Sequence, residues 1–164
     1  DRIAELIENE GSLNRNMPLI CVLLCYIKRR ANLTLIADGA ETLDVRELFL
    51  SVKESSEYLK LYGAPASVFC DGEFTASAET VLLAFDFWQA VIEAFLPGLE
   101  AFMAKLSEEN GAFVIKITAD CELEFSLPEK LRDRIENAKG ELRSVSEDGT
   151  RFITLILPKG GDGK

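Results

Sequence analysis

The chain has 164 residues, of which 48% are hydrophobic and 28% are charged, a composition typical of one globular domain or of a domain with a small appendage. Its formal net charge of −10 argues against binding to nucleic acid or to an anionic membrane surface, because attraction to phosphate needs clustered cations. The sequence contains no histidine, which excludes Ser-His and Cys-His nucleophiles, imidazole metal sites and phosphohistidine within these residues.

The first third of the sequence predicts two helices joined by a short turn. The first is centred on the apolar run 19–27, and the second is expected to begin at Asp44, with Glu47 as its capping-box partner, and to end before Pro65. The apolar and small residues of the second helix form a heptad seam: Val45, Leu48, Val52, Ser55, Leu59 and Tyr62. Because the first helix is apolar all round, we expect a second copy of the chain to cover it, giving a homodimer through this hairpin.

Two other features of the chain concern charge and cysteine chemistry. The basic run 28–30 is interpreted as a solvated helix face, with contact to a phosphate or an acidic partner as the alternative. The cysteines lack the close pairs or added histidines of a zinc site, so we expect no metal, buried free thiols and a reducing, cytoplasmic location. They are Cys21, Cys25, Cys70 and Cys121. No apolar run approaches the ~20 residues of a membrane helix.

The remainder predicts a mixture of short strands and helices. Residues 67–70 and 73–74, on either side of Asp71-Gly72, are expected to form a small hairpin. The other expected elements are an apolar helix over 77–96, an antiparallel strand pair around Asn110-Gly111, a charged helix opened by Ser126 and Glu129 and ended by Gly140, and two strands over 141–146 and 152–157. The predicted fold is α+β, with a helical hairpin over 1–63 and a two-layer α/β sandwich over 64–164.

The last residues carry a family resemblance. The stretch 131–158 resembles the closing helix and hairpin of sensor histidine kinases, in which an Arg-containing helix leads to a glycine, a strand, a Gly-Thr turn and a final strand ending in Pro. The resemblance covers essentially the whole chain. It implies that helix 77–96 lies where the GHKL-type ATPase domain has its N-box, and that hairpin 13–62 corresponds to the dimerisation and phosphoacceptor helices. The run Tyr-Ile-Lys-Arg-Arg-Ala-Asn-Leu at 26–33 is similar to a subgroup of bacterial sensor kinases.

The resemblance also implies roles for particular residues, and departures from them. Glu93 takes the place of the catalytic glutamate, and Asp120 takes the place of the aspartate that accepts the adenine amino group. Ala94 replaces the asparagine that holds Mg²⁺, and it offers no oxygen ligand. Glu122 and Glu124 replace two glycines, which adds negative charge beside a triphosphate. The second glycine loop has no counterpart, and the hairpin lacks the phosphoacceptor histidine.

The carboxylates have simpler interpretations as well. Glu93 is favoured as a solvated helix carboxylate over a catalytic one. Alternation predicts that Asp120, Glu122 and Glu124 share one face of a strand, either as a solvated face, which is favoured, or as a cluster for acid–base work or a divalent metal.

The leading hypothesis is a histidine-kinase-like signalling module that is deficient in phosphotransfer and acts by dimerisation and by docking a partner such as a response regulator. We expect no cofactor. One alternative is an active, atypical kinase that binds ATP and Mg²⁺ and acts through Glu93 and Asp120, so whether the chain is an enzyme stays open. Another is an α/β domain that binds a small molecule. The chain is expected to be a piece of a longer protein, such as the cytosolic part of a membrane-attached sensor.

Overall fold

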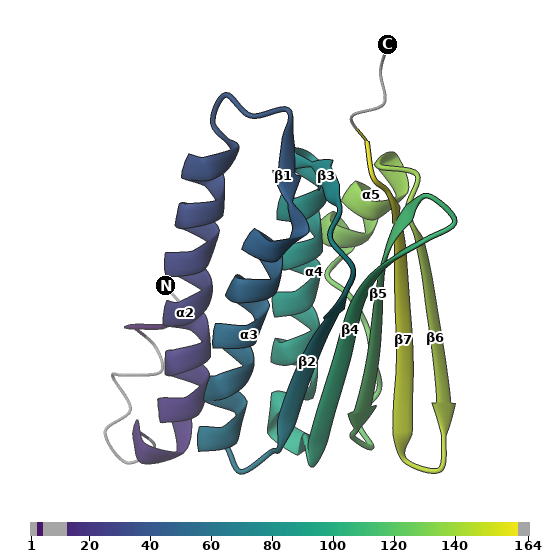
Figure 1. Ribbon diagram of the computed structural model, residues 1–164. Coiled ribbons are helices and arrows are strands. Elements are labelled where there is room, and N and C mark those ends of the chain that lie inside the picture. The colour runs from purple at the N-terminus through teal and green to yellow at the C-terminus, as the bar shows by residue number, and fades with distance from the viewer. Residues whose placement is uncertain (1–2, 5–12, 161–164) are drawn as a thin grey trace.

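A computed structural model describes residues 3–4 and 13–160 of the chain. Figure 1 shows a layer of helices on one side of a twisted sheet. The elements in chain order are α2 (Leu13–Ala37), β1 (Thr42–Asp44), α3 (Val45–Leu61), β2 (Ala66–Asp71), β3 (Thr75–Ser77), α4 (Ala78–Phe95), the 3₁₀ turn η2 (Leu96–Gly98), β4 (Ala101–Glu109), β5 (Ala112–Asp120), α5 (Glu129–Asn137), β6 (Glu141–Glu147) and β7 (Thr150–Pro158). The α+β fold class predicted from the sequence is confirmed.

The main sheet has five strands in the order β2-β4-β5-β7-β6. Strands β4 and β5 pair antiparallel around Asn110-Gly111, and β6 and β7 pair around Asp148-Gly149. In both turns the two central residues have positive φ, between 47° and 82°, which is the geometry of a type I′ turn. Both of these predicted hairpins are therefore confirmed.

The predicted hairpin around Asp71-Gly72 is wrong. Strand β2 runs parallel to β4, whereas β3 pairs antiparallel with β1 in a separate two-stranded ladder. A partner as short as residues 73–74 would have left most of β2 unpaired, and β4 offers six matching positions. Buried backbone groups need partners along their whole length, so the long-range parallel pairing replaces the local turn.

Local capping fixes where the helices begin and end. The Asp44 side chain accepts a hydrogen bond from the Arg46 N–H at 2.8 Å, which confirms the predicted start of α3. Helix α5 begins at Glu129 after Pro128 and has no side-chain cap, so the predicted capping box of Ser126 and Glu129 is wrong. Its end is marked by Lys139, whose φ is 56°, and the Gly140 N–H then bonds back to Ile135 O at 2.8 Å.

Helix α4 is the centre of the core. Its side chains from Thr80 to Phe95 are mostly buried, and Trp88 is fully buried with its ring edge-on to Phe102 of β4, the ring centroids 5.2 Å apart. The segment Ala78–Gly98 is long and apolar enough to cross a membrane, so the expectation that no apolar run approaches that length is wrong, but 61% of its most apolar 18-residue window is buried inside the protein. A core helix meets the same criterion of length and composition, and burial accounts for the apolar sequence here.

The helices before residue 63 share this core. Leu33 of α2, Leu48 of α3 and Leu155 of β7 belong to one continuous cluster of buried side chains. Helix α3 packs against both α2 and β2, and α2 also packs against α4. The division into a hairpin (1–63) and a sandwich (64–164) stays a prediction, and any such division crosses a continuous apolar core.

Candidate functional site

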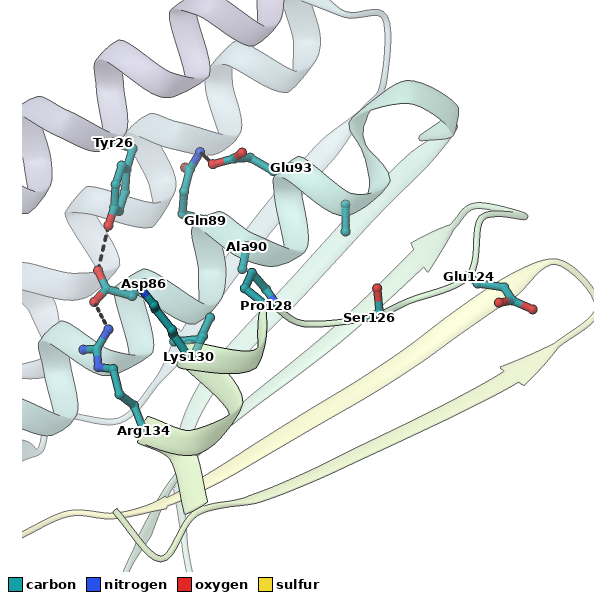
Figure 2. A pocket seen from close by; sticks show the side chains of 12 residues that line it. Tyr26, Asp86, Gln89, Ala90, Glu93, Glu124, Ser126, Pro128, Lys130 and Arg134 are labelled. Carbon is teal, nitrogen blue, oxygen red and sulfur yellow. Dashed lines mark hydrogen bonds and ion pairs between the residues drawn. The ribbon is translucent and has the colours of Figure 1, made fainter. Parts of the chain in front are cut away.

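A pocket of about 550 Å³ lies between α4 and α5, with α2 and the loop 121–128 at its sides (Figure 2). Helix α4 supplies one wall, and α5 with the loop before it supplies the other. Its lining residues are Tyr26, Asp86, Gln89, Ala90, Glu93, Ala94, Glu124, Ser126, Pro128, Lys130, Leu131 and Arg134. Three of the residues to which the family resemblance assigns roles or departures, Glu93, Ala94 and Glu124, therefore lie at this cavity.

Gln89 and Glu93 are one helical turn apart on α4 and contact each other. The Gln89 Nε2 donates a hydrogen bond to Glu93 Oε1 at 2.9 Å. Gln89 is 96% buried, since only 4% of its surface is exposed. Its carbonyl oxygen, Oε1, is buried and has no hydrogen-bond partner among the described residues. Buried polar atoms are nearly always paired, so this unpaired acceptor distinguishes the pocket from the rest of the core.

Asp86 joins three helices beside the same pocket. Its Oδ1 accepts hydrogen bonds from the Tyr26 hydroxyl at 2.9 Å and from Arg30 Nε at 2.7 Å, both on α2. Its Oδ2 accepts from Arg134 Nη1 on α5 at 2.8 Å. Burial, together with the Asp86 charge, raises the pKa of Tyr26 to about 12. The phenol therefore stays protonated and donates to Asp86 throughout the physiological range of pH.

Sequence reasoning missed this Asp86 cluster, although a signal for it exists. Asp86 is the only charged residue between Glu79 and Glu93 in an otherwise apolar helix. A carboxylate in such a run needs cationic partners, because burying an unpaired charge destabilises the folded protein. The basic run 28–30 also points to it, because Arg30 binds Asp86 and both other cations bind Glu54 of α3. The prediction of a merely solvated basic face is thus wrong in its detail: the run forms ion pairs within the chain.

Asp120 lies at the last position of β5 and lines a different pocket. Its Oδ1 accepts a hydrogen bond from the Thr150 hydroxyl at 2.9 Å. The pocket beside it, of about 540 Å³, is also lined by Glu122 and Asp148, and Glu93 is not among its lining residues. The structure therefore does not bring Glu93 and Asp120 together at one cavity.

The predicted carboxylate face of a strand is wrong. Strand β5 ends at Asp120, so Glu122 and Glu124 lie in the loop that follows it. Glu124 lines the pocket of Glu93, whereas Glu122 stays with Asp120. Within the described part of the chain, no group of three His, Cys, Asp or Glu side chains is arranged to hold a metal ion. Cys121, the first residue after the strand, is 2% exposed.

The cysteines are free thiols. Cys25 and Cys121 are buried, as predicted, and Cys21 and Cys70 are partly exposed. Burial, followed by the nearby Glu54 charge, raises the pKa of Cys25 to about 11. Since the thiolate is the reactive form of cysteine, Cys25 is an unreactive packing residue.

No protein-family model matches the chain, and no curated protein matches it in sequence. Solved structures do match it in fold. A bacterial phosphotransferase is 14% identical, with 94% of this chain and 84% of that chain covered and a TM-score of 0.59. The histidine kinase domain from the Erythrobacter litoralis EL346 blue-light activated histidine kinase is 12% identical, with 96% and 93% covered and a TM-score of 0.56.

A third similar structure is a kinase catalytic domain by itself. The catalytic domain of histidine kinase ThkA is 14% identical, with 72% of this chain and 95% of that domain covered and a TM-score of 0.52. At these identities the likeness concerns the fold, and function has to be argued from the site. The resemblance found in the C-terminal residues is confirmed at that level: the chain has the α+β fold of histidine kinase catalytic domains.

Proposed function

We propose that the chain is a histidine-kinase-like signal-transduction module that does not transfer phosphate and acts through dimerisation and the docking of a partner such as a response regulator. The fold supports the kinase-like part of this proposal. The observation that carries the rest is the separation of Glu93 from Asp120. The two residues that the family resemblance assigns to ATP line different pockets, which have no lining residue in common, and this separation supports a chain without a single ATP site.

The chemistry of each pocket also disfavours a triphosphate. Ala94 provides no oxygen for Mg²⁺, and Glu124 places a carboxylate in the same pocket. Glu122 and Asp148 add two more carboxylates beside Asp120. Negative side chains repel phosphate at short range, which supports a chain without bound ATP, although Lys130 and Arg134 add two cationic side chains to the first pocket.

Titration of the chain with Mg-ATP is expected to give no heat beyond dilution at up to about 1 mM nucleotide. The measurement is isothermal titration calorimetry at neutral pH. A saturable signal in the wild-type chain that disappears in Glu93→Gln and in Asp120→Asn would contradict the proposal. It would favour the alternative of an atypical kinase that binds ATP. Glu129→Gln is the matched control, since Glu129 is exposed on α5 and lines neither pocket.

Helix α2 carries the surface that supports dimerisation. Five of its apolar side chains are between 42% and 73% exposed: Met17, Leu24, Ile27, Leu35 and Ile36. Met17 and Leu24 are seven residues apart, and Ile27 follows three residues later, which is the spacing of a seam between paired helices. Exposed apolar residues in such a row are typical of a protein interface.

We expect the wild-type chain to sediment as a dimer at micromolar concentration. The double variant Leu24→Glu/Ile27→Glu is expected to sediment as a folded monomer, because two carboxylates on each copy would be buried against apolar side chains. Val145→Glu is the matched control, since Val145 is 60% exposed on β6, far from α2 in the fold. A monomeric wild type, or a dimer that survives the α2 substitutions, would remove the dimer from the proposal.

A further inference from the structure

We propose that Asp86 is a shared acceptor for which α2 and α5 compete, so that the position of α2 sets how firmly α5 is held against α4. This inference goes beyond the proposed function, because it requires neither phosphotransfer nor dimerisation. It rests on the hydrogen bonds of one carboxylate, on the charges around it, and on the few buried side chains that fix α5.

The two oxygens of Asp86 are divided unequally between the two helices. Oδ1 accepts from the Tyr26 hydroxyl at 2.9 Å and from Arg30 Nε at 2.7 Å, both on α2. Oδ2 accepts from Arg134 Nη1 of α5 at 2.8 Å and, at a longer 3.3 Å, from Arg30 Nη2. Figure 2 shows Asp86 between Tyr26 and Arg134. Both guanidinium groups therefore share Oδ2, and the longer bond of Arg30 is the one to this oxygen.

The charges of the cluster make this sharing competitive. A single carboxylate, whose side chain is 10% exposed, pairs with the guanidinium groups of both Arg30 and Arg134. Arginine stays protonated in proteins, so the two cations repel each other across the carboxylate that they both bind. Each arginine is therefore expected to contribute less to the stability of the fold while the other is present.

Helix α5 depends on this ion pair because few buried side chains fix it. It has nine residues, of which Leu131 and Ile135 are buried, and Pro128 at its N-cap has no side-chain group that could form a hydrogen bond. A short element with few buried side chains opens locally at a small cost in free energy. The bond from Arg134 to Asp86 is therefore a substantial part of what holds α5, one wall of the pocket, against α4.

A shift of α2 away from Asp86 would transfer the carboxylate to α5. Arg30 moves with its own helix, since its Nη1 also donates to the Thr34 hydroxyl at 2.6 Å. Arginine and a carboxylate bind best through two parallel hydrogen bonds. Once Arg30 and Tyr26 have left, Arg134 can take both oxygens without a competing cation. Docking of α2 and firm attachment of α5 are thus expected to oppose each other.

The test is a double-mutant cycle measured by urea denaturation at pH 7. Arg30→Met and Arg134→Met each remove one guanidinium group and keep an aliphatic stem that can pack in its place. Each single variant keeps one arginine on Asp86, whereas the double variant leaves the carboxylate without either of them. The loss in the free energy of unfolding of the double variant is therefore expected to exceed the sum of the two single losses. A double loss equal to the sum, or smaller, would overturn the proposal, because independent or mutually supporting contacts give those results.

A second cycle, of Arg30→Met with Lys130→Met, is the matched control. Lys130 is an exposed cation that lines the same pocket, and among the residues that the structure describes it forms no ion pair with Asp86. The losses in this cycle are expected to add. A coupling as large as that between Arg30 and Arg134 would overturn the proposal, since it would indicate general repulsion between cations rather than a shared carboxylate.

Hydrogen exchange of the α5 amides tests the consequence for α5 in a single variant. The Ala138 N–H bonds to Arg134 O at 3.0 Å near the end of the helix. In Arg30→Met this amide is expected to exchange about two- to fivefold more slowly than in the wild type, the factor that ion-pair energies at partly exposed sites produce. In Lys130→Met it is expected to exchange at the wild-type rate. Unchanged or faster exchange in Arg30→Met would overturn the proposal. Failure of these tests leaves the Mg-ATP and sedimentation results unaffected, so the two proposals fail separately.

Discussion

Replacing Trp88 by alanine is expected to lower the free energy of unfolding by about 3 to 5 kcal/mol, the largest effect of any single substitution considered for this chain. Trp88 is fully buried at the centre of α4, and its ring packs edge-on against Phe102. The substitution removes this aromatic contact and leaves a cavity between the helix layer and the sheet. Domains of this size have a total stability of about 5 to 15 kcal/mol, so the variant is expected to be partly unfolded at 37 °C.

Urea denaturation followed by circular dichroism measures the effect, since the variant has lost the only tryptophan of the chain. Phe69→Ala is the matched control: Phe69 is 54% exposed on β2, and its loss should cost about 1 kcal/mol or less. A second variant tests the polar end of the ring. The Trp88 Nε1–H donates to Ser55 Oγ at 3.1 Å, so Ser55→Ala should cost about 1 to 3 kcal/mol by leaving that donor unpaired. Equal stability of the Trp88→Ala and Phe69→Ala chains would contradict the packing argument.

Replacing Asp86 by asparagine is expected to lower the free energy of unfolding by about 2 to 3 kcal/mol. The Asp86 side chain is 10% exposed, and the change leaves the guanidinium groups of Arg30 and Arg134 facing each other without a carboxylate. Breaking a fully buried ion pair costs about 3 to 5 kcal/mol. The expected loss is smaller here because the Arg134 side chain is 48% exposed and its charge is screened by solvent.

Urea denaturation at pH 7 is again the measurement, with Asp133→Asn as the matched control. Asp133 is exposed on α5, and its change should shift stability by no more than about 0.5 kcal/mol. The Asp86 variant should also shift the titration of Tyr26, which ultraviolet absorbance follows. The Asp86 charge is one cause of the raised pKa of that phenol, so its removal should lower the Tyr26 pKa from about 12 toward 10. Indistinguishable stabilities of the two asparagine variants would show that the three-helix cluster contributes little.

The Asp86 cluster bears on the proposed signalling role because it ties α2 to the pocket. Tyr26 and Arg30 come from α2, Asp86 from α4 and Arg134 from α5. A displacement of α2 along α4 by one helical turn, about 5.4 Å, would break the hydrogen bonds that Tyr26 and Arg30 donate to Asp86. The position of α2, which carries the proposed dimer seam, is therefore linked to the groups that line the pocket.

The elements that could be predicted from the sequence are those whose signal is local. Asn110-Gly111 and Asp148-Gly149 specify type I′ turns by themselves, and the apolar content of 77–96 predicts a core helix whatever its surroundings. Asp44 marks the start of α3 because its own side chain caps the next turn. Asp71-Gly72 carries an equally local turn signal, yet its hairpin does not form. The partner of β2 lies more than thirty residues away in the chain, and no local pattern encodes that pairing.

The sequence by itself determined that these residues hold no histidine for phosphotransfer, that position 94 offers no oxygen to Mg²⁺, and that the chain is an α+β domain of kinase-like pattern. Only the tertiary structure decided that Glu93 and Asp120 line different pockets, that Asp86 joins three helices, and that the Gln89 carbonyl has no partner within residues 3–4 and 13–160. Composition is a property of the sequence itself, and turn chemistry depends on adjacent residues, so both can be predicted from the sequence. Pockets and buried polar contacts depend on which distant segments pack together, and that is fixed only when the whole core forms.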